Sequence, residues 1–543
     1  MKKNMNNLQK KFLVFLQPNK YKSYLLKTVF PIGMLSLLML IGGCEKFLEK
    51  DPSFIVKENY YNNETDVNIG LAGVYDILGR EELYGGALPL QFSISDEGIY
   101  SRSSYTSGPA VYNYDSSEPS VANLWKYLYE GIERANVFLS RIDAVTMDED
   151  KKTVAKGEVK FLRAYYYFLL VSNWGDVPLK TAPTASVNDV NIKRTPQKVV
   201  YDFITAEMVE AEGMVKTASE IGYGGKVSKS AVRGILARVY LKMAGAPLNL
   251  GLPMFKEALK WSKKIVYPDN GIKEHRLNPS YKQIFTNYAA DKYDIGESIW
   301  EVEFYGNRGG DFEAGRIGNT IGLQCNDEKY GYGYGFINTT EKLYKSYGAT
   351  DVRRDWTIAP YHYNYNGVTV KDSTNWTSAE IYNRNCGKFR RVYETLLPKN
   401  KNYTPMNFPL LRYADVLLMF AEAENEVNGA SDLAKTALKE VRDRANAADV
   451  TTGVTNPSEL QTLIRKERFL ELAFEGSRRF DLIRWDEFVS NMNQLGTDIQ
   501  TNAVTAWKFG ALAGKNVSNK HNVLPIPVLE LSLNSEMVQN KEW

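Results

Sequence analysis

The stretch that decides the fold runs Phe161-Leu-Arg-Ala-Tyr-Tyr-Tyr-Phe168. Its apolar residues recur at i, i+3, i+4 and i+7, the spacing that places side chains on one face of a helix. These residues are Phe161, Ala164, Tyr165 and Phe168. A later stretch repeats the stripe with Val232, Leu236, Val239 and Met243. The sequence therefore predicts helices that are each packed on one face, and this periodicity dominates residues 63–267.

The pattern changes downstream and then returns. Trp300, Val302 and Phe304 alternate with glutamates, which predicts a half-buried strand. Residues 305–410 are rich in Gly, Asn and Tyr and show turn chemistry instead of a periodic core. Helical stripes resume at residue 413 and again over residues 460–474. The sequence predicts a mostly α fold, an irregular tetratricopeptide-like repeat scaffold with loop-rich insertions and a few short strands. We expect residues 44–543 to form a single domain, with the loop-rich region 305–410 inside it.

The N-terminal 43 residues read as a secretory signal. They hold seven Lys and no acidic residue, and an apolar run follows that is too short for a confident membrane span. Ile41-Gly-Gly-Cys44 resembles the bacterial lipobox, whose cysteine is acylated and becomes the mature N-terminus. The sequence therefore predicts a signal peptide over residues 1–43 and lipid attachment at Cys44. The alternative is an ordinary thiol just after a signal peptide.

Charge and cysteine usage exclude several classes of protein. Without the signal, the 67 Lys and Arg fall by seven to 60 against 64 Asp and Glu, a net charge of −4. A mildly acidic chain argues against a nucleic-acid partner, which needs a concentrated basic face. Cys325 and Cys386 are too few for a disulfide framework. Whether the two cysteines pair is left open by the sequence.

Several long motifs together resemble the SusD/RagB family from the lipobox to the last residues. The motifs are Cys44–Pro52, Trp125–Asn136, Gly157–Tyr165, Trp174–Leu179, Leu411–Leu418, Ala421–Asn425, Glu467–Gly476, Arg479–Trp485 and Leu524–Pro527. The resemblance implies a helical fold with tetratricopeptide-like repeats, a lipid anchor in the outer membrane, and a cell-surface location. It also implies a non-catalytic protein without a cofactor that takes glycans or peptides to a partner, a SusC-like TonB-dependent outer-membrane transporter.

An acidic helix face favours a rival hypothesis, a surface glycoside hydrolase. Glu467, Glu471 and Glu475 are spaced at i, i+4 and i+8, and glycosidases use two carboxylates across the sugar bond. Glu467 also falls within an apolar stripe, where an unpaired charge would be costly. We therefore expect it to form a buried ion pair that joins helices, with nearby arginines as partners.

Metal and triad chemistry lack their usual motifs. His275, His362 and His521 are far apart, and the chain has no His-Glu-x-x-His, Cys-x-x-Cys, Gly-x-Ser-x-Gly or phosphate-loop pattern. The sequence thus predicts neither a metal site nor catalytic residues.

Aromatic residues in Gly-, Ser- and Asn-rich loops are the candidate ligand contacts. A ring offers a flat apolar face and, in tyrosine, a polar tip. The candidates are Tyr100, Tyr105, Tyr112, Tyr114, Tyr330, Tyr332, Tyr334 and Trp376. For any single ring the alternative is a structural role or contact with the partner barrel. The sequence as a whole favours a receptor for oligosaccharide or peptide over a hydrolase, or over a scaffold with protein partners only.

Overall fold

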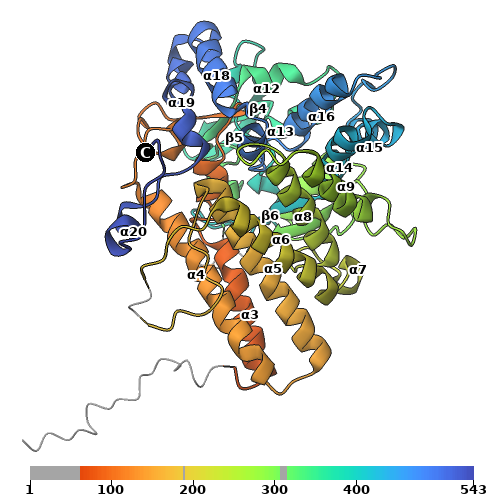
Figure 1. Ribbon diagram of the computed structural model, residues 1–543. Helices are drawn as coiled ribbons and strands as arrows, with labels where there is room; N and C mark the ends of the chain where they lie inside the picture. The colour runs from red at the N-terminus through yellow and green to blue at the C-terminus, as the bar shows by residue number, and fades with distance from the viewer. Residues whose placement is uncertain (1–60, 187–189, 306–314) are drawn as a thin grey trace, which may run out of the picture. The chain divides into compact units, whose positions relative to one another are not determined.

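The computed structural model describes residues 61–186, 190–305 and 315–543 (Figure 1). The predicted signal peptide and Cys44 lie outside these residues. Residues Tyr61–Trp543 form one compact unit. The fold is mostly α, with 52% helix and 8% strand, as the sequence predicts.

Helices run through both halves of the described chain, and the two longest lie in the N-terminal half. The first set is α3 (Glu64–Gly79), α4 (Pro119–Arg141), α5 (Glu149–Trp174), α6 (Gln197–Met214), α7 (Ala218–Ile221), α8 (Lys229–Ala244), α9 (Leu252–Val266) and α10 (Tyr281–Ala289). The second set is α11 (Ile317–Thr320), α12 (Glu341–Ser346), α13 (Arg354–Thr357), α14 (Tyr413–Asn428), α15 (Asp432–Arg444), α16 (Pro457–Glu471), α17 (Arg478–Arg484), α18 (Phe488–Asn502), α19 (Leu512–Asn516) and α20 (Val528–Leu533).

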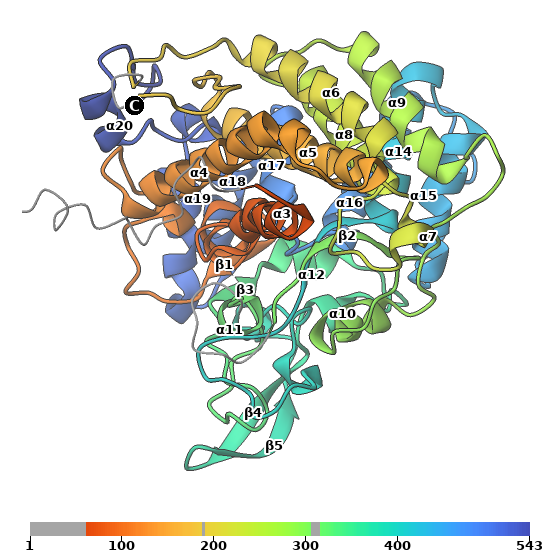
Figure 2. The ribbon, with the colours of Figure 1, turned by 90° about the horizontal axis from the view of Figure 1, so that it is seen from below.

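Consecutive helices pack as neighbours, α3 on α4, α4 on α5, α5 on α6 and α8 on α9 (Figures 1 and 2). The tetratricopeptide-like repeat stays a prediction, because pair lengths vary from 23 and 26 residues in α4 and α5 to 16 and 15 in α8 and α9.

Helix α5 is buried on more than the predicted face. Asp148 caps its N-terminus by accepting from the Lys151 N–H, and acidic residues in the first turn favour the helix dipole. Tyr166 and Tyr167, which lie off the predicted stripe, are fully buried as well. They are tolerated because their hydroxyls donate to the Val74 and Lys180 carbonyls. The expectation of a one-sided helix is therefore wrong for α5, which lies in the centre of the core.

In the described part of the chain, six short strands form three antiparallel pairs. They are β1 (Gly98–Tyr100) with β3 (Ile337–Thr339), β2 (Ser298–Val302) with β6 (Phe408–Arg412), and β4 (Tyr361–Asn366) with β5 (Thr369–Asn375). The predicted strand at Trp300 exists as β2, but its burial differs from the prediction. All five residues are buried, and Glu301 is only 3% exposed. Asn407 donates to its carboxylate at 3.0 Å, which offsets part of the cost of burying it.

Buried ion pairs tie the C-terminal helices together. Arg468 of α16 donates to Asp415 of α14 at 2.7 Å and to Asp481 of α17 at 2.8 Å. Asp415, Arg468 and Asp481 belong to three of the motifs quoted above, so ion pairing explains charged positions in those motifs that hydrophobic periodicity does not.

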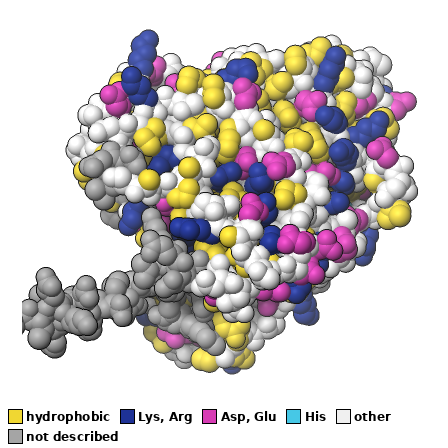
Figure 3. All heavy atoms as spheres, turned by 60° about the horizontal axis from the view of Figure 1, so that its bottom comes forward, with side chains coloured by type: hydrophobic (Ala, Val, Ile, Leu, Met, Phe, Trp, Pro, Cys, Tyr) yellow, Lys and Arg dark blue, Asp and Glu magenta, His cyan; other side chains and the backbone are white. Residues whose placement is uncertain are grey.

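Charges of both signs are interspersed over the face seen in Figure 3, and hydrophobic side chains on that face are scattered among them. Within the described ranges no helix combines the length and apolar character needed to cross a bilayer.

Candidate ligand-binding site

Two loops that are far apart in the sequence meet through the β1–β3 pair. Tyr100 lies opposite Ile337 in the antiparallel register, and the Ser101 N–H donates to the Phe336 carbonyl at 2.8 Å. This pairing sets the ring of Tyr100 beside that of Phe336, with centroids 5.4 Å apart and planes 13° apart. Candidate rings from the loop around Tyr100 and from the loop before Ile337 therefore belong to one surface.

The rings continue in both directions from this contact. The ring centroids of Tyr105 and Tyr100 lie 4.4 Å apart. Tyr334 stacks on Phe336, with centroids 5.1 Å apart and ring planes 4° apart. Tyr332 meets Tyr334 edge-on, with centroids 5.2 Å apart. We call this series, Tyr105, Tyr100, Phe336, Tyr334 and Tyr332, the aromatic run. All five rings are half-buried, so each combines a packed side with an accessible one.

Alternating glycines orient the aromatic run. In extended backbone, successive side chains point to opposite faces. A Cβ on Gly333 would lie 2.4 Å from the Leu323 carbonyl oxygen, and one on Gly335 would lie 2.8 Å from Asn385 Nδ2. The glycines thus face packed backbone and side chains, which leaves Tyr332 and Tyr334 on the opposite side.

Arg102 fixes one side of the run. Its guanidinium lies 5.1 Å from the Phe336 ring centroid, and Nη2 donates to the Tyr334 carbonyl at 2.5 Å. A cation over a ring face is an attractive arrangement. Arg102 therefore lies between β1 and residues 331–336, which we call the Gly-Tyr segment.

The β4–β5 hairpin forms a recess next to the run. Figure 2 shows the hairpin extending beyond β3 and α11. We call this cavity of about 360 Å³ the hairpin recess. The ring centroids of His362 and Trp376 lie 4.1 Å apart. The Asn326 N–H donates to the Tyr365 hydroxyl at 3.2 Å. Its walls include the rings of His362, Tyr363, Tyr365, Trp376 and Trp507, and its amide groups belong to Gln324, Asn326, Asn338, Asn383 and Asn385.

A second cavity, the loop recess, has a volume of about 190 Å³. Tyr100, Tyr105 and Phe509 supply rings to it, and Lys508 and Lys515 supply cations. These lysines come from the 3-10 segment Thr505–Ala511 and from α19. Arg102 lines both recesses, so the two cavities share one side chain.

The eight predicted site residues separate into groups. Four belong to the aromatic run: Tyr100, Tyr105, Tyr332 and Tyr334. Trp376 lines the hairpin recess, and Tyr330 contacts Tyr363 of the hairpin at 5.5 Å.

Tyr112 and Tyr114 lie elsewhere. Tyr112 is 4% exposed, donates to the Ile94 carbonyl and packs on His521. Tyr114 packs on His521 and Trp543. These two tyrosines therefore pack against the C-terminal segment and do not belong to the aromatic run.

The prediction missed Arg102, His362 and Trp507, which line the recesses. Trp507 donates its indole N–H to the Asn383 amide oxygen. A Trp and a Phe two residues apart, at Trp507 and Phe509, were a signal that the sequence offered outside any helical stripe.

The predicted acidic face lies away from both recesses. The prediction that all three glutamates share one helix face is wrong for Glu475, because α16 ends at Glu471. Glu467 accepts from Arg353 and Arg442, Glu471 from Arg353, Arg412 and Arg444, and Glu475 from Lys388 and Arg412. The surrounding cations hold the pKa of the Glu471 carboxyl far below its usual range, although burial alone would raise it. The predicted buried ion pair is confirmed, and none of the three carboxylates lines either recess.

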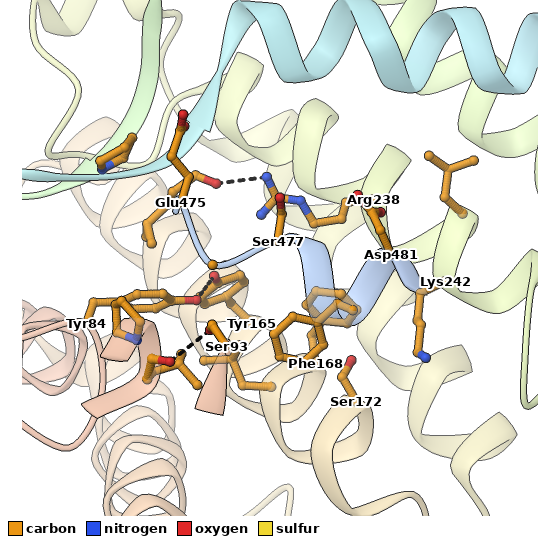
Figure 4. Close-up of a pocket in the computed structure, with 18 of the residues that line it drawn as sticks. Tyr84, Ser93, Tyr165, Phe168, Ser172, Arg238, Lys242, Glu475, Ser477 and Asp481 are labelled. Carbon is orange, nitrogen blue, oxygen red and sulfur yellow. Dashed lines mark hydrogen bonds between the residues drawn. The ribbon is translucent and has the colours of Figure 1, made fainter. Parts of the chain in front are cut away.

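A separate cavity of about 90 Å³ lies among the helices (Figure 4). Tyr84 and Tyr165 share a hydrogen bond of 2.5 Å at its wall, and Phe168 packs nearby. Lys242 lines it as well, and burial together with Arg479 and Arg484 lowers the pKa of its amine to about 7. Its small volume and buried walls separate this cavity from the surface recesses.

Within residues 61–186, 190–305 and 315–543, no group of three His, Cys, Asp or Glu side chains is placed to hold a metal ion. Cys325 and Cys386 are both buried and unpaired there.

Two family models match the chain. The model described as "SusD family" matches residues 296–543, and the one described as "Starch-binding associating with outer membrane" matches residues 46–241. The chain is 26% identical to SusD-like protein P25 of Formosa agariphila, over 93% of this chain and 96% of that protein. It is 23% identical to the starch-binding protein SusD of Bacteroides thetaiotaomicron, over 87% and 89%.

Solved structures agree in fold. A SusD homolog from Bacteroides thetaiotaomicron matches with a TM-score of 0.82 at 26% identity, covering 90% of this chain and 98% of that one. Surface glycan-binding protein A from the same organism, solved in complex with laminarihexaose, has a TM-score of 0.68 at 19% identity, covering 88% and 100%, and shares the fold. On the motifs, the helical architecture and two family models that together match most of its length, the chain belongs to the SusD/RagB family.

Proposed function

We propose that this chain is a non-catalytic cell-surface receptor that binds a soluble glycan and passes it to a TonB-dependent outer-membrane transporter. The observation that carries the proposal is the aromatic run beside a recess lined with rings and amides. A relative named as a starch-binding protein and a family model described as associating with the outer membrane support it.

The side chains of the hairpin recess suit a sugar better than an apolar ligand. Flat rings such as Trp376 and Trp507 offer faces for the C–H surface of a pyranose, and tyrosine adds a hydroxyl at the ring edge. Amide side chains both donate and accept, which matches the mixed hydrogen bonding of sugar hydroxyls. Five such amides line this one recess.

The same lining argues for binding without hydrolysis. A glycosidase of the usual kind needs two carboxylates flanking the scissile bond. Among the described residues of the hairpin recess none is Asp or Glu. Glu467 and Glu471 of α16, and Glu475 just after it, are buried in ion pairs, where their carboxylates stabilise the fold.

The anchor and the partner complete the proposal. Cys44 would attach the mature chain to the outer membrane, and a SusC-like barrel would receive the ligand. Support for these two points comes from the lipobox and from the family to which the chain belongs. Isolation of outer membranes with a tagged chain tests the partnership, because the barrel should co-purify at a fixed ratio.

The ligand is tested with the soluble form, residues 45–543. We would screen it against glycans and peptides by retention in affinity gels, by calorimetry and by analysis of products. Selective binding of a glycan without cleavage is expected. Trp376→Ala should weaken that binding roughly tenfold, since it removes one stacking face. Tyr293→Ala is the matched control, because Tyr293 is 48% exposed and lines neither recess.

Three results would contradict the proposal. Cleavage products would favour a surface glycoside hydrolase. Selective binding of peptides alone would change the ligand class. Absence of any soluble ligand, with the barrel still co-purifying, would favour a scaffold with protein partners only.

A further inference from the structure

The cations of the two recesses are set apart from the other charges of the fold. Arg102 lines both recesses, and Lys508 and Lys515 line the loop recess. Within the part of the chain that the structure describes, none of the three takes part in an ion pair. Arg102 bonds Ser101 and the Tyr334 carbonyl, and Lys515 donates to Gln500 at 2.9 Å. Their positive charges are therefore not neutralised within the described protein.

No carboxylate of the described lining opposes these cations, because neither recess includes Asp or Glu there. The nearby carboxylates serve the backbone instead. Glu118 accepts from the Ser120 N–H, Asp327 from the Val370 N–H at 2.9 Å, and Glu380 from the Thr377 N–H at 2.9 Å. These bonds direct the acidic groups into caps and turns rather than into the recesses.

Another recess on the same molecule has the opposite character. It lies beside α3 and β2 and is lined by Asp76, Glu301 and Glu303 together with Lys226. The absence of acid around the aromatic run is thus a local property of that surface. Residues 44–543 are mildly acidic overall, so a site whose charged side chains are all cations is less expected by chance.

We propose that the ligand of this site is an anionic glycan, whose carboxylate or sulfate groups are held by Arg102, Lys508 and Lys515 while its rings lie on the aromatic run. This inference rests on the proposed receptor function and narrows its ligand. A guanidinium forms paired hydrogen bonds to carboxylate or sulfate oxygens, and lysines add point charges. Because the two recesses share Arg102, one chain of several sugars could span both.

The test compares galactose-derived glycans that differ in charge. The soluble form, residues 45–543, is titrated with pectic galactan as a neutral arm, polygalacturonate as a uronate arm, and carrageenan as a sulfated arm. We expect selective binding in one acidic arm, with affinity that falls as salt rises because exposed charges are screened. The acidic arm that binds identifies the source of the negative charge.

Charge-removing variants locate the interaction. Lys508→Gln and Lys515→Gln should each weaken acidic-glycan binding roughly two- to fivefold. Arg102→Gln should weaken it at least about tenfold, and Arg102→Lys should restore part of the loss. Lys226→Gln is the control, since Lys226 is a half-buried lysine in the other recess and should leave binding unchanged. Circular dichroism and melting temperature confirm that each variant is folded.

The outcomes separate the two proposals. Binding of the neutral galactan, insensitive to salt and to the three charge variants but weakened by Trp376→Ala, overturns the anionic class and keeps the receptor. Acidic-glycan binding that Lys226→Gln weakens as much as Arg102→Gln overturns the site. Failure of all three arms overturns this inference, and the receptor is overturned with it only when the wider screen of glycans also finds no ligand.

Discussion

Arg353 and Glu467 form a fully buried ion pair, with Nη1 of Arg353 2.6 Å from Oε1 of Glu467 and neither side chain exposed. Arg442 donates to the second oxygen of the same carboxylate, so one glutamate joins α15, α16 and the turn before α13. Asp351 balances Arg353 from the other side at 2.7 Å. The pair is one element of a buried charge network and lies away from the recesses.

Removal of Glu467 should therefore destabilise the fold without touching ligand binding. Glu467→Ala leaves Arg353 and Arg442 buried with one partner fewer, which typically costs about 3–5 kcal/mol. Chemical denaturation measures the free energy of unfolding, and ligand affinity is measured below the new midpoint.

An exposed pair provides the control for Glu467. Asp443 binds Lys439 on the surface at 2.6 Å, and Asp443→Ala should change stability by less than about 1 kcal/mol. If Glu467→Ala kept full stability and abolished cleavage of some glycan, the structural role of α16 would be wrong and the hydrolase hypothesis would return.

Glu97 should make stability depend on pH. Burial raises the pKa of its carboxyl to about 8, opposed by the Phe474 N–H and reinforced by Asp96. A carboxyl with a raised folded pKa contributes stability that is full below about 4.5 and is lost as pH rises through about 8. Glu97→Gln mimics the protonated form, so it should match the natural protein near pH 4.5 and exceed its melting temperature above pH 8.

Glu422 provides the opposite sign. Arg484 and Trp485 bind its carboxylate, and although burial opposes them, they lower its pKa to about 2. The contribution of Glu422 to stability is present above about pH 4.5 and is lost as pH falls toward about 2, so Glu422→Gln should lower stability at neutral pH.

One result would contradict the role of Glu97. It is a melting temperature of the Glu97→Gln variant that runs parallel to that of the natural protein from pH 4.5 to 9.

Gly333 should be required for the aromatic run. In Gly333→Ala the new Cβ would meet the Leu323 carbonyl oxygen at 2.4 Å, so the segment must shift and the Tyr332 and Tyr334 rings with it. We expect a lower melting temperature and weaker ligand binding. Gly213→Ala, in α6 with nothing within 4 Å of the new methyl, should be neutral or slightly stabilising. Equal effects of the two substitutions would disprove this account of the Gly-Tyr alternation.

The helices could be predicted from the sequence because each depends on neighbours three or four residues apart. Periodicity predicts helix around Phe161, but it cannot reveal that Tyr166 is buried, which depends on the Val74 carbonyl of α3. Likewise, the alternating pattern predicts that Glu301 is exposed on a half-buried strand, whereas the structure buries it beside Asn407, which is distant in the sequence. Burial on the second face is a property of the tertiary fold.

The site was only partly predictable for the same reason. Composition pointed to the Gly-Tyr segment, but the turn interpretation missed that its glycines face inward. The turn chemistry predicted within residues 305–410 is present at Gly367, which has positive φ between β4 and β5, but the strands on either side of it were not predicted. The meeting of Tyr100 with Phe336 requires the β1–β3 register, which no local pattern reveals.

Lipid attachment at Cys44 can be tested by substitution in the full chain. Cys44→Ala should abolish labelling by fatty acid and release the protein from the membrane fraction, because we propose Cys44 as the acylated residue. Cys386→Ala is the matched control, since that thiol is fully buried and should leave both properties unchanged. Protease treatment of intact cells then tests orientation, because a surface receptor is cleaved from outside. A Cys44→Ala chain that still labels and stays on the membrane would disprove the anchor, and the receptor would need another means of reaching its transporter.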